Sequence, residues 1–132
     1  MEQVDYVKFH EQQAYVVNHS IIYFRKNENP SGLHTYIVNL TADVLFHKGI
    51  INFTIQPSGI GTADVETDKF SFEIETGLKN DITDIKNRIE LYKKQGKETI
   101  IIVPNQESKK KYIEKYPNVK VLTLIDFWRL EL

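Results

Sequence analysis

The sequence predicts an α/β protein in which a mixed β-sheet carries helices on both faces. Three patterns support this prediction. Apolar and polar residues alternate over 69–76, which indicates a strand. Apolar residues recur at helical spacing over 34–49 and again between about 80 and 95. The run 98–104 is apolar almost throughout, as is typical of a strand covered on both faces.

The N-terminal part of the chain has the weakest pattern. Residues 1–13 show no clean period and are predicted to form a loose arm. Residues 14–25 have strand composition interrupted by a polar Asn-His-Ser, which favours a hairpin or a bent strand. We therefore expect residues 1–32 to be an extension that packs on a core formed by residues 33–132, with one domain overall.

The predicted core begins with a helix over 34–49, which Gly49 ends. A strand follows at 51–55. Two further strands, at 62–66 and 69–76, are separated only by Thr67 and Asp68. These elements predict an antiparallel meander.

The second half of the core alternates helices and strands. Asn80 or Asp81 can cap the second helix, whose buried stripe ends at Tyr92 and which Gly96 terminates. After the apolar strand come a polar helix, a strand and a short helix or packed tail, at about 106–116, 118–124 and 125–132. The predicted order of the core is therefore α-β-β-β-α-β-α-β, and its β-α-β crossovers require parallel strand pairs.

Composition excludes several classes of site. The chain has 132 residues, no cysteine and a formal net charge of −1, so disulfides, thiolate metal sites and cysteine nucleophiles are absent. No apolar run is long enough to cross a membrane, and residues 1–13 lack the apolar segment of a signal peptide. We expect a cytoplasmic protein that does not associate with membranes.

Three acidic residues are predicted to share one face of the hairpin at 62–76. On the second strand Glu73 and Glu75 point together with Ser71, whereas Phe72 and its apolar neighbours point to the other face. If Thr67 and Asp68 form a two-residue turn, Asp64 pairs with Ser71 and becomes a diagonal neighbour of Glu73.

Such a group of carboxylates has two interpretations. Mg²⁺ and Mn²⁺ favour oxygen ligands, and either ion can polarise a phosphodiester and lower the pKa of an attacking water. Alternatively, the three acids form a polar sheet face in contact with solvent, with Glu66 and Lys69 as a surface ion pair. The local pattern alone leaves both open.

The order of elements and these motifs together resemble the PD-(D/E)XK nuclease superfamily. The matching residues are Asp64 in "GTADVE" and Glu73 and Glu75 in "FEIETG". Over about residues 33–124 the chain is similar to the C-terminal nuclease-like domain of replication-relaxation proteins of plasmids and integrative elements, through the further motifs "KNRIELYKKQG" and "TIIIVPN". A proline usually precedes the motif aspartate, whereas this chain has Ala63.

The resemblance implies a restriction-endonuclease-like αβββαβ core and a site that holds Mg²⁺ or Mn²⁺. Asp64 and Glu73 would be the principal metal ligands and His34 a further one. Glu75 stands where the family usually has its catalytic lysine, so the resemblance suggests Lys69 or Lys79 as the source of the ammonium group. Lys69 shares the acidic face, which favours it.

The second helix carries the remaining features of the resemblance. Arg88 and Tyr92 stand where RecB-like members have Gln-x-x-x-Tyr, so only the tyrosine matches. We expect Arg88, Lys93 and Lys94 to contact DNA, although basic residues on a helix are commonly just its solvated face.

Three functional hypotheses follow from the sequence. The first is a metal-dependent endonuclease-like domain that acts on DNA during plasmid or mobile-element replication, with a second copy of the chain or a replication protein as a partner. The second is a catalytically inactive DNA- or protein-binding module with the same fold. The third is an unrelated α/β interaction protein whose acidic face is solvated.

Overall fold

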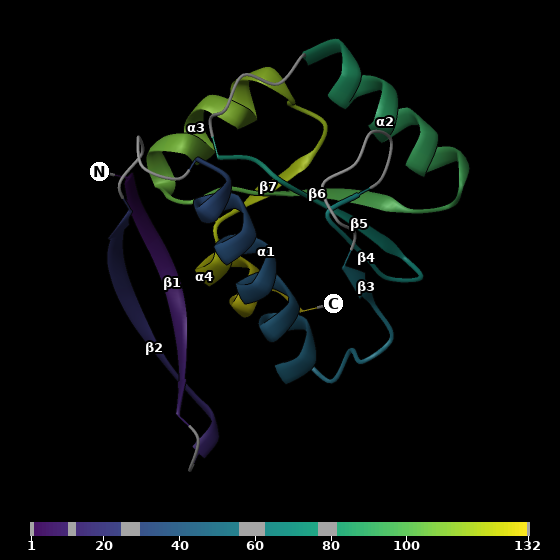
Figure 1. Ribbon diagram of the computed structural model, residues 1–132. Coiled ribbons are helices and arrows are strands. Elements are labelled where there is room, and N and C mark those ends of the chain that lie inside the picture. Colours follow the sequence, from purple (N-terminus) through teal and green to yellow (C-terminus); the bar gives the residue numbers. More distant parts are fainter. Residues whose placement is uncertain (1, 11–12, 25–29, 56–62, 77–81, 132) are drawn as a thin grey trace.

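The computed structural model describes residues 2–10, 13–24, 30–55, 63–76 and 82–131. Its centre is a five-stranded mixed sheet with the strand order β3-β4-β5-β6-β7. Helices cover both faces of this sheet: α1 and α4 lie on one side, and α2 and α3 on the other (Figure 1). The predicted α/β class, with a mixed sheet flanked by helices, is confirmed.

The elements follow one another in a regular order along the chain. After α1 come three strands, and the rest of the chain alternates helix and strand. The bounds are α1 Pro30–His47, β3 Thr54–Ile55, β4 Val65–Glu66, β5 Phe70–Ile74, α2 Ile82–Lys94, β6 Glu98–Ile102, α3 Gln106–Lys115, β7 Lys120–Leu122 and α4 Leu124–Arg129. Strands β3, β4 and β5 pair antiparallel, and β5, β6 and β7 pair parallel. Strands β3, β4 and β7 are shorter than the sequence predicts.

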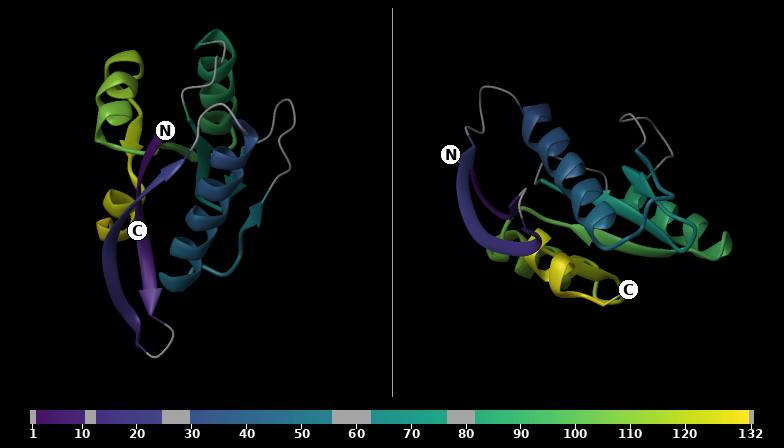
Figure 2. Two further views of the ribbon diagram at one scale, coloured as in Figure 1. Left: turned by 60° about the vertical axis from the view of Figure 1, so that its left-hand side comes forward. Right: turned by 90° about the horizontal axis from the view of Figure 1, so that it is seen from below.

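The N-terminal region corrects one prediction and excludes one of two alternatives in another. Residues 1–13 were expected to be a loose arm, but β1 spans Glu2–His10. The hairpin or bent strand expected within 14–25 is one strand, β2, which spans Gln13–Phe24 and pairs antiparallel with β1. The polar Asn-His-Ser does not break it, and these three residues pair with Lys8, Val7 and Tyr6 of β1. This two-stranded sheet lies beside α1 and α4 (Figures 1 and 2).

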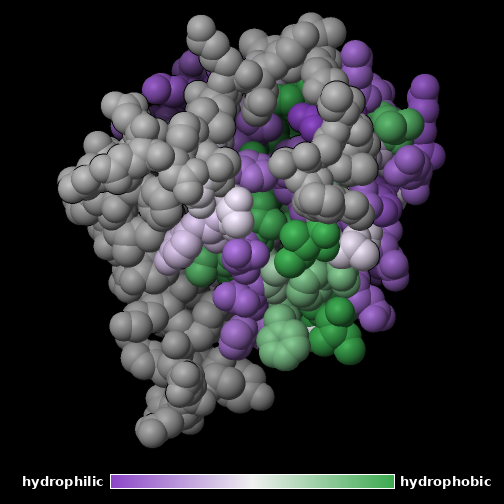
Figure 3. All heavy atoms as spheres, viewed as in Figure 1, coloured by the Kyte–Doolittle hydropathy of each residue, from purple (hydrophilic) through white to green (hydrophobic). Residues whose placement is uncertain are grey.

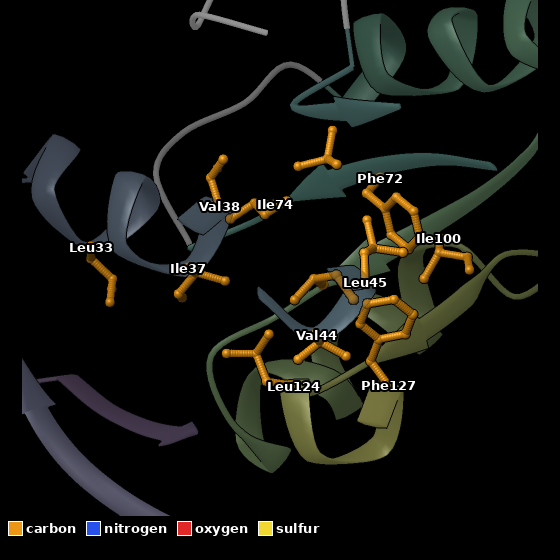
Figure 4. Packing of buried hydrophobic residues seen from close by; sticks show 12 residues of the cluster. Leu33, Ile37, Val38, Val44, Leu45, Phe72, Ile74, Ile100, Leu124 and Phe127 are labelled. Carbon is orange, nitrogen blue, oxygen red and sulfur yellow. The ribbon is translucent and has the colours of Figure 1, made fainter. Parts of the chain in front are cut away.

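The main apolar core lies between the sheet and the helices α1 and α4. It unites side chains from both helices with the inward-facing residues of β5 and β6, among them Ile37, Leu45, Phe72, Ile100 and Phe127, which are fully buried (Figure 4). The rings of Phe72 and Phe127 lie 5.1 Å apart between their centroids. A smaller cluster on the opposite face joins Ile85 of α2, Tyr112 and Tyr116 of α3, and Ile101, Val103 and Val121.

Two glycines end helices where the sequence places them. Gly49 and Gly96 have φ values of 84° and 81°, a conformation that residues with a Cβ atom rarely adopt. Phe46 near the end of α1, and Ile51 and Ile55 after Gly49, have exposed side chains, the last of them in the edge strand β3. Figure 3 shows apolar residues on the surface of this face of the molecule. Among the described residues, no helix combines the length and apolar character that crossing a membrane requires.

Candidate functional site

The turn between β4 and β5 sets the register that brings the acidic residues together. The structure pairs Glu66 with Ser71 and Val65 with Phe72, so the turn is centred on Asp68 and Lys69 and not on Thr67 and Asp68 as predicted. The side chain of Thr67 causes the difference, since its Oγ1 accepts hydrogen bonds from the amides of Lys69 and Phe70 at 3.3 and 3.0 Å.

This register keeps the predicted faces but changes the neighbours. The observed turn is centred one residue later than the predicted one. Each residue of β4 therefore pairs with a residue two positions further along β5 than predicted. A shift of two residues preserves the alternation of side chains between the faces. The paired residues end at Val65 and Phe72, so Asp64 lies just outside the ladder and not in the predicted pair with Ser71. The amide of Asp64 donates to the carbonyl of Phe72 at 3.1 Å, which holds Asp64 beside β5.

The acidic face of β5 is not in contact with solvent. Glu73 and Glu75 are 2% and 1% exposed, because α2 packs over this face. The interpretation of a solvated polar face is therefore wrong for these two residues. The expected pair between Glu66 and Lys69 is also absent: Glu66 instead lies 3.8 Å from the Nζ of Lys97.

Glu73 is held by two side chains of α2. The hydroxyl of Tyr92 donates to Glu73 Oε1 at 3.0 Å, and Arg88 Nη1 lies 3.8 Å from Oε2. Burial nevertheless raises the pKa of Glu73 to about 7, against the lowering effect of Arg88, and the charge of Asp64 raises it further. Burial also raises the pKa of Tyr92, and Glu73 adds to that effect. The positive charge near Glu73 is therefore too small to stabilise its ionised form fully.

Asp64 forms the second part of the site. Its Oδ2 accepts a hydrogen bond from the amide of Ile74 at 2.8 Å, and its Oδ1 lies 3.2 Å from Nε2 of His34 in the first turns of α1. The hydrogen bond to Asp64 raises the pKa of His34, burial opposes this, and the charges of Asp64, Glu75 and Glu73 support it. Three acids in or next to the strands β4 and β5 therefore act on one histidine, and we call Asp64, Glu73 and Glu75 the acidic cluster.

The donor chemistry of this cluster fits a hard divalent cation. Carboxylate oxygens are the ligands that Mg²⁺ and Mn²⁺ prefer. Burial is the main cause of the raised pKa of Glu73, and the charge of Asp64 adds to it. Within the described part of the chain, however, no three His, Asp or Glu side chains are already arranged as a metal-binding group. Asp64 and Glu73 are each engaged with protein partners, so metal binding would have to displace some of these contacts.

The predicted lysines are placed apart from the acidic cluster or lie outside the described residues. Lys69 is exposed in the turn and forms no ion pair with a described residue. Lys79 lies outside the described residues. Lys93 and Lys94 are exposed near the end of α2. None of the described lysines named here places at the acidic cluster the ammonium group that the resemblance requires.

Arg88 and Tyr92 belong to the site in a way that the sequence interpretation missed. Arg88 was assigned to DNA contact, but its side chain is 17% exposed and lies against Glu73. Tyr92 was assigned to core packing, and it is buried, yet its hydroxyl also bonds Glu73. The signal was in the spacing: Ile85, Arg88 and Tyr92 are three and four residues apart and so share the buried face of α2.

Comparisons with known proteins add no identification. The chain matches no family model, no curated protein and no solved structure.

Proposed function

We propose that this chain is a nuclease-like domain that acts on DNA phosphodiesters with the help of a bound Mg²⁺ or Mn²⁺ ion. One observation carries the proposal: Asp64 lies against β5, where its Oδ2 accepts a hydrogen bond from the amide of Ile74, between the buried Glu73 and Glu75, and His34 is in contact with Asp64. The resemblance stated above adds an association with plasmid or mobile-element replication and a restriction-endonuclease-like core.

The burial of the acids supports a functional role over a merely structural one. Removing a carboxylate from water is unfavourable, and only well-matched partners offset the loss of hydration. Glu73 has one hydroxyl donor and one guanidinium at 3.8 Å, and its pKa is raised to about 7. A protein selected for stability alone would favour an apolar residue at this position.

Each residue has a role in this proposal. Asp64 and Glu73 would hold the ion, with His34 as a neighbouring donor. When bound, such an ion polarises the phosphodiester and lowers the pKa of water. Tyr92 and the amide of Ile74 fix the carboxylates of Glu73 and Asp64 in place. Glu75 supplies a proton acceptor beside them, in the position where the family usually has lysine.

The test is a nicking assay on supercoiled and single-stranded DNA with Mg²⁺, Mn²⁺ or EDTA. The variants are Asp64→Asn and Glu73→Gln, which remove charge with little change of shape. Asp68→Asn is the matched control, because Asp68 is an exposed carboxylate in the adjacent turn. We expect metal-dependent nicking by the wild type and Asp68→Asn and its loss in the other two. Two results would contradict the proposal. One is nicking that survives each of the two substitutions, and the other is no nicking by the wild type with Mg²⁺ and none with Mn²⁺.

The inactive DNA-binding module remains the second candidate, and one observation favours it. The guanidinium of Arg88 already lies against Glu73 and neutralises part of the negative charge that a bound metal ion would neutralise. Lys69 is exposed in the turn, apart from these acids. This candidate expects DNA binding in EDTA that weakens with salt, and no nicking with either metal. The absence of salt-dependent binding would reject it.

A further inference from the structure

A groove lies on the face of the sheet that carries α2 and α3. Its volume is about 900 Å³, at the upper end of the range for ligand sites, and it is bounded by α2, the start of β6, the end of α3 and the segment that leads into β7. It is separate from the acidic cluster. Tyr92 and Arg88 of α2 face Glu73, whereas the residues that line the groove, such as Ile89 and Lys93, belong to another side of the same helix.

The rim of the groove is basic. Five lysines and two glutamates are the charged residues that line it: Lys86, Lys93, Lys97, Lys115, Lys120, Glu90 and Glu98. Lys97 and Lys120 already lie 3.8 Å from the carboxylates of Glu66 and Glu98. Lys86 and Lys93 are exposed and form no ion pair with a described residue. The rim therefore offers excess positive charge, although the whole chain has a net charge of −1.

The floor of the groove differs from its rim. Ile89 and Val119 are partly buried on the apolar cluster of this face, and Pro117 is exposed beside them. The hydroxyl of Thr99 also belongs to the lining, is buried, and has no hydrogen-bond partner. Apolar surface between lysines suits a ligand that has flat apolar groups and anionic groups along the same chain.

We propose that this groove binds single-stranded nucleic acid, with bases against the apolar floor and phosphates at the lysine rim. A single strand exposes the faces of its bases, whereas a duplex stacks them inside and would reach only the rim. The inference deepens the proposed function and rests on it in one respect: the proposed function is what identifies the anionic ligand of the groove as a nucleic acid. It does not depend on cleavage, because the groove and the acidic cluster lie on different sides of α2.

The test measures binding in EDTA, so that no cleavage can occur. The probe is a fluorescein-labelled oligothymidylate of about 12 nucleotides, followed by fluorescence anisotropy at several salt concentrations. The variant Lys93→Gln/Lys115→Gln removes two lysines that line the groove. Its matched control is Lys94→Gln/Lys110→Gln, which removes the same charge from the same two helices at exposed positions outside the lining.

We expect the groove variant to bind about tenfold more weakly and its salt slope to fall by about 1.4, because each lost phosphate contact contributes about 0.7 for a single strand. The control should change affinity less than about twofold. The variant Asp64→Asn/Glu73→Gln should bind like the wild type, which separates this inference from the failure of the nuclease proposal.

Three results would overturn the inference. The first is no binding of the oligonucleotide by the wild type. The second is an equal loss of affinity in both lysine variants, which would reflect net charge and not the groove. The third is equally tight binding of polyglutamate, which would assign the groove to acidic protein segments. Equal thermal unfolding midpoints for the two lysine variants and the wild type would confirm that these substitutions leave folding unchanged.

Discussion

The two faces of β5 differ more than any other pair of surfaces in the molecule. One face presents Phe72 and Ile74 to the apolar core under α1 and α4. The other presents Ser71, Glu73 and Glu75, all buried, to α2. The next strand is more apolar: β6 has Ile100 and Ile102 on one face, and Ile101 beside the buried Thr99 on the other, with Val103 directly after the strand. The apolar face therefore supplies stability, whereas the polar face of β5 carries residues of the proposed site.

The largest expected effect lies on the apolar face. Phe72→Ala should lower the free energy of unfolding by about 3–5 kcal/mol, since Phe72 is fully buried and its ring packs on Phe127. Urea denaturation measures this change. Phe70→Ala is the control, because Phe70 is only partly buried on the same face and should lose less. Equal losses would show that the core is not centred where we place it.

A smaller effect is expected where α1 meets the C-terminal helix. Lys48 Nζ donates to the carbonyl of Trp128 at 2.7 Å and to that of Leu130, and it lies 5.7 Å from the ring centroid of Phe127. Burial lowers the pKa of Lys48. Lys48→Met keeps the apolar stem but loses both hydrogen bonds, so we expect a loss of about 1–3 kcal/mol in urea denaturation. A loss below about 0.5 kcal/mol would mean that solvent replaces both bonds.

The cap of α4 provides a third, weaker contribution to the same face. Thr123 and Asp126 form a capping box, in which Thr123 Oγ1 accepts from the amide of Asp126 at 3.2 Å and Asp126 Oδ2 accepts from that of Thr123 at 3.1 Å. Thr123→Ala should cost about 1 kcal/mol, and Thr123→Ser should restore most of it. A serine variant as unstable as the alanine variant would contradict the role of the hydroxyl.

The polar face should give an effect of the opposite sign. Burial raises the pKa of Glu73 from its ordinary 4.5 to about 7 in the folded protein. Folded Glu73 therefore retains a proton that the unfolded chain releases, so its contribution to stability is complete below about pH 4.5, falls as the pH rises, and is lost above about pH 7. Glu73→Gln should remove this fall and match or exceed the stability of the wild type at pH 8.

The pH experiment needs EDTA and attention to the neighbours of Glu73, which are Arg88, Tyr92, Asp64 and Glu75. The raised pKa of His34 adds a loss of stability that begins above pH 6.5. The informative quantity is therefore the difference between the wild type and Glu73→Gln at each pH, measured by urea denaturation. A difference that stays constant from pH 4.5 to 8 would contradict the raised pKa of Glu73.

Much of the fold could be predicted because it depends on local patterns. The apolar period of α1 and the alternation over β5 each specify an element and its faces, and the apolar run of β6 indicates cover on both sides. Burial of Glu73 could not be predicted from that alternation, because a period of two shows which residues share a face but not whether a helix covers it. The register depended on one hydrogen-bonding side chain, Thr67, which no periodicity reveals.

The candidate site could likewise be predicted only in part. Sequence indicated Asp64, Glu73, Glu75 and His34, and the structure places Asp64 against the amide of Ile74 in β5 and in contact with His34. Sequence reasoning missed the contacts of Arg88 and Tyr92 with Glu73, because it treated the charged residues of α2 as a solvated face. Which lysine, if any, approaches the acids depends on tertiary packing, which local patterns do not specify.

The central claim is that the acidic cluster is a cation site and not a by-product of folding. Isothermal titration calorimetry with Mn²⁺ tests it most directly, on the wild type, Asp64→Asn and the exposed control Asp68→Asn. We predict binding by the wild type and the control, and affinity at least about tenfold weaker in Asp64→Asn. No binding by the wild type, or equal affinity in all three proteins, would contradict it.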